Sequence, residues 1–201
     1  ETDASPPFSG WVEGRFIVCD VRIGSDPSIR DIILDLALPG RIAEDGEAFL
    51  PCSDSGSVHL VGAGHVALAT AKVAAFAGFE VVVMDDRAEF ASAERYPEAR
   101  EVRVLENFDQ CLKDLGPDDY VVIVTRGHLH DRDVLAQALR TGAGYVGMIG
   151  SRGKRDAVYR SLLENGYTQA DIDRVFCPIG LVIGADTPEE IAVSIVGEMI
   201  G

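Results

Sequence analysis

The stretch "HLVGAGHVALATAKVAAFAGFEVVVMDDR", residues 59–87, joins two apolar runs through a turn of small residues. The first run ends at Gly62, and Gly64 and Ala67 follow it with the spacing G-x-G-x-x-A. Small residues at this spacing, after a strand and before a helix, are typical of turns that bind a dinucleotide. The stretch therefore raises the question of what approaches the backbone so closely that side chains would obstruct it.

Each small residue has a separate task in such a turn. Gly62 permits the tight turn, Gly64 lets a pyrophosphate reach the backbone, and Ala67 lets the helix pack closely on the strand. Backbone N–H groups at the start of the helix expected over residues 66–77 would then hold the anion. The alternative is that these small residues serve only the packing of helix on sheet.

The second apolar run ends in two acidic residues, Asp85 and Asp86, followed by Arg87. An acidic side chain about 20 residues beyond the first glycine accepts hydrogen bonds from ribose hydroxyls in dinucleotide-binding folds. A carboxylate at Asp85 would repel a ribose 2′-phosphate, although Arg87 could offset this, so NAD is favoured over NADP. The alternative is that both aspartates only cap the strand.

Apolar, β-rich runs alternate with helical patterns through the rest of the chain. The strand candidates are "VHLVG", "EVVVMD", "EVRVLE", "YVVIVT" and "GYVGMIG". Alternation of this kind predicts parallel strands with crossover helices, and runs that are apolar at nearly every position predict helices on both faces. Helices are expected over residues 66–77, 131–139 and 188–199, the last with Thr187 and Glu190 as a capping box. The predicted fold class is α/β, a Rossmann-like, mostly parallel sheet.

The first 55 residues form a different region. "RFIVCDV" predicts a strand, "SIRDIILDLAL" favours a helix, and "PGRIAEDGEAF" contains turn signals. The short polar segment "LPCSDSGS" is the most favourable boundary. We therefore expect a small N-terminal α/β appendage over residues 1–55 and a Rossmann-like domain over residues 56–201.

Composition excludes several classes of partner. The 201 residues carry a net charge of -15 with a pI near 4.5, which opposes binding to nucleic acid or to an anionic membrane surface. No apolar run approaches the roughly 20 residues that span a bilayer. The four cysteines lie far apart without a C-x-x-C pair, which predicts neither a zinc site nor a disulfide framework. We expect a cytoplasmic protein.

Two further segments carry candidate ligand contacts. In "TRGHLHD", Thr125, His128 and His130 follow the fourth predicted strand, where open α/β sheets bind ligands. The histidines are candidates for proton transfer or metal binding, or they hydrogen-bond to backbone. No third metal ligand is evident, so no metal site is assigned.

In "GMIGSRGKR", Ser151 can cap a helix whose first turn carries Arg152, Lys154 and Arg155. Three cations at a helix N-terminus predict an anion site for a phosphate or pterin phosphate. The alternative is a solvated basic turn.

The segment "CPIGLVIGAD", residues 177–186, places glycines and a proline among apolar residues. This pattern predicts a tight loop, with Gly180 at its centre, close to a ligand or to another subunit. Cys177 is a candidate nucleophile, sulfur carrier or metal ligand, although a buried free cysteine is usually inert.

Five segments in this order, "GAGHVA", "DDR", "TRGHLHD", "YVGMIGSRGKR" and "PIGLVIGADTPEEIAVSIVGEMI", resemble the C-terminal Rossmann domain of the XdhC/CoxI family of xanthine dehydrogenase accessory proteins. The resemblance covers residues 58–200. It implies that the protein binds molybdenum cofactor (molybdopterin), protects it while a cysteine desulfurase helps install its terminal sulfur, and delivers it to an apo molybdenum hydroxylase. The first 55 residues do not show the family's N-terminal domain with its glycine-rich cofactor segments.

We therefore predict a maturation factor, or chaperone, for a molybdenum hydroxylase of the xanthine dehydrogenase type, and we expect a homodimer. The alternative is an NAD(P)-dependent oxidoreductase or a dinucleotide-sensing domain that uses the same turn. A dehydrogenase needs a placed acid or base, and only His128 offers one, so no catalytic residue is assigned. The expected cofactor-binding residues are Gly62, Gly64, His65, Ala67, Asp85, Arg87, Thr125, His128, Ser151, Arg152, Lys154 and Gly180.

Overall fold

The computed structural model describes residues 21–22, 41–42, 47–49, 56–126 and 128–201. The chain divides into two compact units, Glu1–Ser55 and Gly56–Gly201. In the first unit, three short strands pair antiparallel in the order β1-β3-β2. They are β1 (Val21–Arg22), β2 (Arg41–Ile42) and β3 (Glu47–Phe49). The helix expected over residues 28–38 lies outside the described residues.

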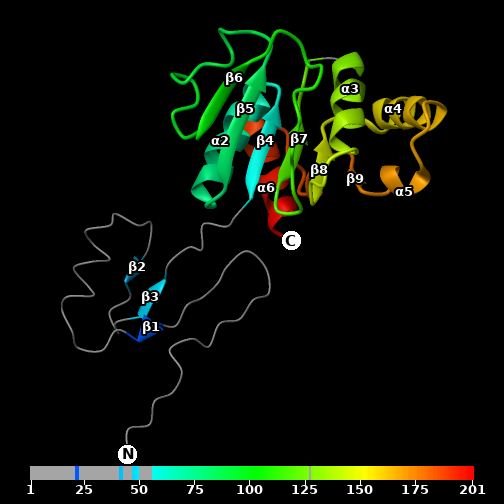
Figure 1. The fold of residues 1–201 in the computed structure, drawn as a ribbon. Coiled ribbons are helices and arrows are strands. Elements are labelled where there is room, and N and C mark those ends of the chain that lie inside the picture. The colour runs from blue at the N-terminus through cyan, green and yellow to red at the C-terminus, as the bar shows by residue number, and fades with distance from the viewer. Residues whose placement is uncertain (1–20, 23–40, 43–46, 50–55, 127) are drawn as a thin grey trace, which may run out of the picture. The chain divides into compact units, whose positions relative to one another are not determined.

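The second unit is built on a six-stranded sheet in which all neighbouring strands are parallel (Figure 1). Its strands are β4 (Ser57–Val61), β5 (Glu80–Asp85), β6 (Glu101–Val104), β7 (Tyr120–Ile123), β8 (Tyr145–Met148) and β9 (Val175–Phe176). The spatial order β6-β5-β4-β7-β8-β9 is the Rossmann order 3-2-1-4-5-6 when the strands are counted along the chain. The predicted Rossmann-like parallel sheet is confirmed, and β9 is a strand that the sequence pattern did not predict.

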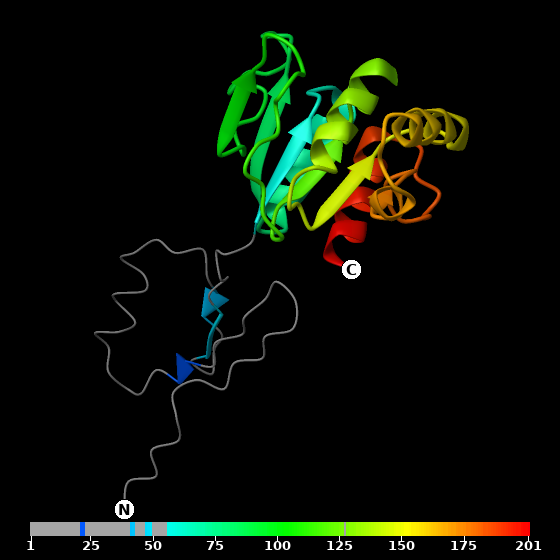
Figure 2. The same cartoon turned by 45° about the vertical axis from the view of Figure 1, so that its right-hand side comes forward.

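Helices cover both faces of this sheet, as the apolar strands predicted (Figures 1 and 2). One face packs on α2 (His65–Phe76) and α6 (Pro188–Ile200), and the other on α3 (His128–Ala138), α4 (Arg152–Glu164) and the short α5 (Gln169–Ile172). The predicted capping box is confirmed, because Thr187 accepts from the Glu190 N–H while the Glu190 carboxylate accepts from the Thr187 N–H.

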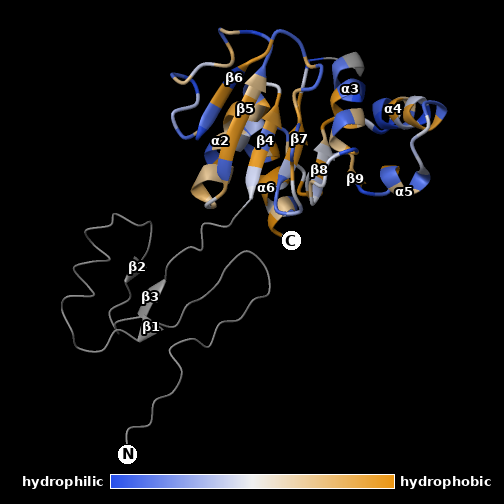
Figure 3. Ribbon diagram, in the orientation of Figure 1, coloured by the Kyte–Doolittle hydropathy of each residue, from blue (hydrophilic) through white to orange (hydrophobic). Residues whose placement is uncertain are grey.

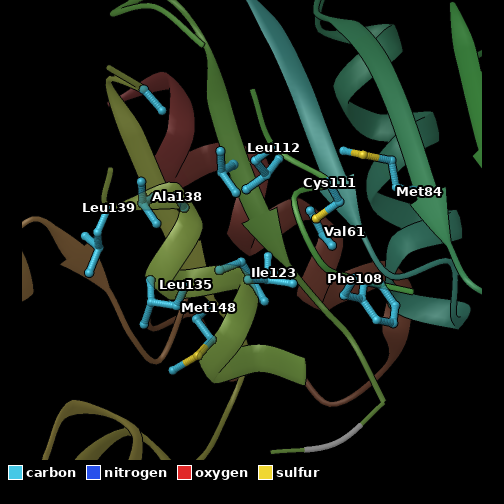
Figure 4. Close-up of a cluster of buried hydrophobic side chains, with 14 of the residues drawn as sticks. Val61, Met84, Phe108, Cys111, Leu112, Ile123, Leu135, Ala138, Leu139 and Met148 are labelled. Atoms are coloured by element: carbon cyan, nitrogen blue, oxygen red, sulfur yellow. The ribbon is translucent and has the colours of Figure 1, made fainter. Parts of the chain in front are cut away.

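Alternation along each inner strand divides the core into two clusters. Val58 and Leu60 of β4 pack toward α2 and α6, whereas Val61 packs toward α3 and α4. Figure 4 shows the cluster on the side of α3 and α4. It contains Val61 of β4, Ile123 of the neighbouring strand β7 and Leu135 of α3. The inner strands are accordingly the most hydrophobic part of the unit (Figure 3).

Strand β6 departs from the expected burial on both faces. Its side chains are half-buried or exposed, and Glu101 and Arg103 pair with each other on the surface. The strand is the last one on its side of the sheet, so that fewer elements cover it. Its polar residues therefore mark an edge strand.

The close approach at Gly62 comes from the protein's own backbone. Gly62 has a φ of 108°, and a Cβ atom there would overlap the carbonyl oxygen of Val124, in the segment that continues β7. The Val124 N–H donates to the Val61 carbonyl over 2.9 Å, which holds the two segments together. A Cβ atom at Gly64 would meet no atom of the described residues within 4 Å, so of these two glycines Gly64 is the one that leaves room for a ligand.

We expect Gly62→Ala to lower the free energy of unfolding by about 2–4 kcal/mol, because the new side chain meets both a forbidden φ and the Val124 backbone. Gly64→Ala is the matched control and should cost no more than about 1 kcal/mol, since it changes only an N-cap glycine in open space. Urea denaturation of the two variants checks this. Equal losses would show that the close approach at Gly62 is not what constrains the turn.

A second prediction concerns pH and the buried side chain of His59. Burial lowers the pKa of His59, Asp119 opposes the shift, and Arg103 and Arg100 add to it. The folded protein binds a proton at His59 less readily than the unfolded chain does. The free energy of unfolding is therefore unaffected by protonation of this residue above the unfolded pKa of about 6.5 and decreases as the pH falls below that value. Denaturation from pH 8 to pH 5 should show this loss, and His59→Gln should reduce it. An unchanged pH profile in the variant would contradict the assignment.

Candidate functional site at the carboxyl edge of the sheet

The candidate site lies where β4 and β7, neighbours in the sheet, end side by side. After β4 the chain continues to β5 on one side, and after β7 it continues to β8 on the other. A crevice forms at such a switch point in open α/β sheets, and ligands bind there. The segments after β4, β5, β7 and β8, all of which carry predicted site residues, share this edge.

The glycine turn opens directly onto this edge. Gly64 is the N-cap of α2 in an extended conformation, and no side chain of the described residues caps the helix. His65 is exposed at the first helical position, and Ala67 is fully buried, as close helix–sheet packing requires. The first-turn N–H groups of α2 and the open space at Gly64 together favour an anionic ligand.

Asp85 is buried and fully engaged with the protein itself. Its carboxylate accepts from the Ala63 N–H over 2.7 Å and from the Arg87 N–H over 3.0 Å. The Arg87 guanidinium adds two hydrogen bonds, of 2.8 and 2.9 Å. Burial would raise the pKa of Asp85, but the hydrogen bonds from Arg87 and Ala63 hold it below its ordinary value. Both oxygens thus already have donors, and the expected ribose contact remains a prediction.

The segments after β5 and β7 are joined by a second ion pair, between Asp86 and Arg126. The Arg126 guanidinium donates to Asp86 Oδ2 over 2.6 Å. Arg126 was not among the residues expected from the sequence.

A third network links β7 with the starts of α3 and α4. Thr125 donates from its hydroxyl to Asp131 Oδ1 over 2.6 Å, and Lys154 forms a close ion pair with Asp131 Oδ2. Lys154 Nζ also donates to the Ile149 carbonyl over 3.0 Å. Asp131 has no exposed surface, and the Lys154 side chain is 12% exposed, so this pair is largely shielded from solvent.

The basic turn of α4 is consequently less open to a ligand than its sequence indicates. Ser151 caps the helix by accepting from the Lys154 N–H over 3.3 Å, which confirms the predicted cap. Lys154 is paired with Asp131, and Arg155 pairs with Asp156. Among the described residues, Arg152 has no ion-pair partner, so Arg152 is the cation of this turn most available to an anion.

The loop after β9 lies against α6. Gly180 has a φ of 98°, its N–H donates to Glu198 over 3.0 Å, and a Cβ atom there would overlap the Ser194 hydroxyl. The close approach at Gly180 is therefore internal. Burial raises the pKa of the half-buried Cys177 thiol to about 11, although Arg155 and Lys154 oppose it, which favours the inert alternative for this cysteine.

The two histidines occupy the start of α3. His128 is its first residue, and the His130 ring lies 4.9 Å from the Phe108 ring, centroid to centroid. Within residues 56–126 and 128–201, and in the described strands of the first unit, no cluster of three or more His, Cys, Asp or Glu side chains could hold a metal ion. No described helix is both long and apolar enough to cross a membrane.

The tertiary structure thus gathers the predicted residues into two groups. One surrounds the glycine turn and the other surrounds the start of α4, whereas Gly180 packs on α6. The sequence interpretation gave Arg126 no role, and it gave Asp131 only that of an acidic residue in the first turn of a helix. A signal for Arg126 exists in the sequence, because a charged residue that follows a buried strand within a few positions needs a partner at the carboxyl edge.

Comparisons with known proteins agree with this architecture. A family model described as the XdhC Rossmann domain matches residues 58–199. Over 143 residues, or 70% of this chain, the sequence is 35% identical to the uncharacterized protein YqeB of Escherichia coli (strain K12). Over the same length it is 32% identical to a protein of Bacillus subtilis (strain 168) named as a probable xanthine dehydrogenase subunit.

A solved structure shares the fold. The crystal structure of a xanthine dehydrogenase from Bacillus halodurans superposes with a TM-score of 0.62 at 27% identity, covering 92% of this chain and 54% of that one. The matches to the two curated relatives span only 26% and 41% of those proteins.

Replacing the buried carboxylate of Asp85 should loosen the glycine turn. We expect Asp85→Asn to lower the free energy of unfolding by about 1.5–3 kcal/mol, because it removes charge-assisted hydrogen bonds. Glu101→Gln is the matched control, since Glu101 makes the same two-point contact with Arg103 on the surface, and should cost less than about 1 kcal/mol. Denaturant titration checks both, and equal small losses would refute a structural role for Asp85.

Proposed function

The chain belongs to the XdhC family, and we propose that it binds molybdenum cofactor and assists its sulfuration and insertion into a molybdenum hydroxylase of the xanthine dehydrogenase type. The family is linked to xanthine dehydrogenase maturation, and one relative is named as a probable xanthine dehydrogenase subunit. The observation that carries the proposal is the uncapped start of α2 at the switch point, beside open space at Gly64.

The residues present fit a cofactor that carries a phosphate. In a chain with a net charge of -15, an anion must be held by local groups, because the overall field repels it. The first-turn N–H groups of α2 and the guanidinium of Arg152 are such groups at this edge. When bound, the cofactor supplies the metal centre of the client enzyme, and this chain's residues bind and orient it.

The proposal includes three protein partners. They are the apo molybdenum hydroxylase that receives the cofactor, a cysteine desulfurase that supplies sulfur, and a second copy of this chain. The family match and the name of the Bacillus subtilis relative support the first of these. The other two rest on the family resemblance of the sequence.

A dinucleotide is the second candidate ligand. The G-x-G-x-x-A turn, with its open second glycine and free helix start, favours it on geometric grounds. A dinucleotide-sensing domain needs no more than this binding site. An oxidoreductase also needs an acid or base next to the substrate, and Asp85 and Asp131 are both committed to internal ion pairs.

Native mass spectrometry of the full chain, purified from a molybdenum-replete host, separates these candidates. We expect a retained pterin cofactor. A retained dinucleotide without pterin would overturn the maturation role in favour of sensing or hydride transfer.

Arg152→Ala should reduce cofactor retention at least tenfold, about 1.4 kcal/mol, because it removes the available cation of the α4 turn. Arg160→Ala, an exposed arginine farther along the same helix, has the same charge change and should leave retention unchanged. Lys154→Ala is unsuitable as a binding probe, since it leaves the buried Asp131 carboxylate without its cation and destabilises the fold. Wild-type retention of the cofactor by a folded Arg152→Ala protein would show that Arg152 does not bind the cofactor.

A further inference from the structure

The Asp86–Arg126 ion pair joins the segments that follow β5 and β7, the two strands on either side of β4 and its glycine turn. In the sheet register, Val61 at the end of β4 lies between Met84 of β5 and Ile123 of β7. Asp86 and Arg126 extend beyond those two strands on opposite sides of the turn. Two strands separated by a third lie about 10 Å apart. The side chains of Asp86 and Arg126 span this distance and meet in a contact of 2.6 Å.

The carboxylate of Asp86 has few hydrogen-bond donors in this position. Its side chain is 19% exposed, and Oδ1 is buried without a hydrogen-bond donor among the described residues. Arg87 Nε lies 3.9 Å from Oδ1, and the hydrogen bonds of that guanidinium go to Asp85 and not to Asp86. A carboxylate that gives up solvation for one ion pair gains little net stability, so the contact can be exchanged for another.

Arg126, in contrast to Asp86, is exposed to solvent. The Arg126 side chain is 48% exposed, and among the described residues its guanidinium pairs with Asp86. A guanidinium beside a free helix start and an open glycine presents the donors that a phosphate group needs.

We propose that Arg126 is an anion-binding residue of the glycine-turn crevice. In the absence of ligand the Asp86 carboxylate pairs with the Arg126 guanidinium as an internal counter-ion, and the phosphate of a ligand replaces this carboxylate. The ligand class is a phosphate ester, either a nucleotide or a pterin phosphate. This inference rests on the proposed function, because both place the ligand at the same crevice. No bond is made or broken, since one anion exchanges for another.

Calorimetry with ADP as the probe tests the exchange on the full chain. Asp86→Asn removes the competing carboxylate and should tighten ADP binding about threefold, whereas Arg126→Gln should weaken it about tenfold. The double variant should match Arg126→Gln, because the effect of Asp86 acts through Arg126. Adenosine, which lacks phosphate, should respond to neither change.

The ion pair between Glu80 and Arg100 provides matched controls at the opposite edge of the sheet, where β5 and β6 begin. Glu80→Gln and Arg100→Gln make the same changes in net charge, and ADP affinity should stay at the wild-type value. Thermal unfolding of all variants establishes that each is folded. Equal responses of site and control variants would overturn the proposal, because net charge alone would then explain them.

Cofactor occupancy of the same variants, by native mass spectrometry, distinguishes the two ligand sources. A change in pterin occupancy in the expected directions supports a pterin phosphate at Arg126, and a change confined to ADP supports a nucleotide. If wild type binds a ligand and Asp86→Asn weakens or does not affect it, the counter-ion role is overturned while the proposed function stands. If wild type binds neither ligand, the proposed function fails and this inference with it.

Discussion

The buried carboxylate of Asp85 is the contact on which the carboxyl edge depends. A carboxylate taken out of water must be surrounded by donors, and here they come from the glycine turn and from Arg87. The Gly62 N–H adds a bond of 2.7 Å to the Met84 carbonyl, so that β5 holds the turn at two points. With Val124 against the other side of Gly62, the turn has one open side, at Gly64.

Charges at this edge are balanced in pairs. Asp85 pairs with Arg87, Asp86 with Arg126, and the buried Asp131 with Lys154. The pairs differ in exposure, and their roles differ accordingly. A shielded pair such as Asp131–Lys154 is costly to break from one side and ties α4 to α3, whereas the half-exposed Arg126 can change partner at little cost. The edge thus combines a rigid frame with exchangeable cations, an arrangement suited to holding an anionic ligand in a strongly acidic chain.

The elements themselves were largely predictable because their signals are local. The inner strands carried continuous apolar runs, and the capping box at Thr187 needs only the residues up to Glu190. Strand β9 was missed because two residues are too short for a periodic signal. The exposed side chains of β6 were misjudged because a strand's own sequence does not say that it lies at the edge of a sheet.

The sequence by itself determined the α/β class, the parallel strands, the position of the glycine turn and its resemblance to one family. Each of these follows from patterns within a few residues or from a motif read in order. Only the tertiary structure decided the partners of Lys154 and Arg126, because Lys154 and Asp131, and Arg126 and Asp86, lie far apart in the sequence and meet through the strand order. For the same reason the neighbour of Gly62 is backbone, and the room for a ligand lies at Gly64.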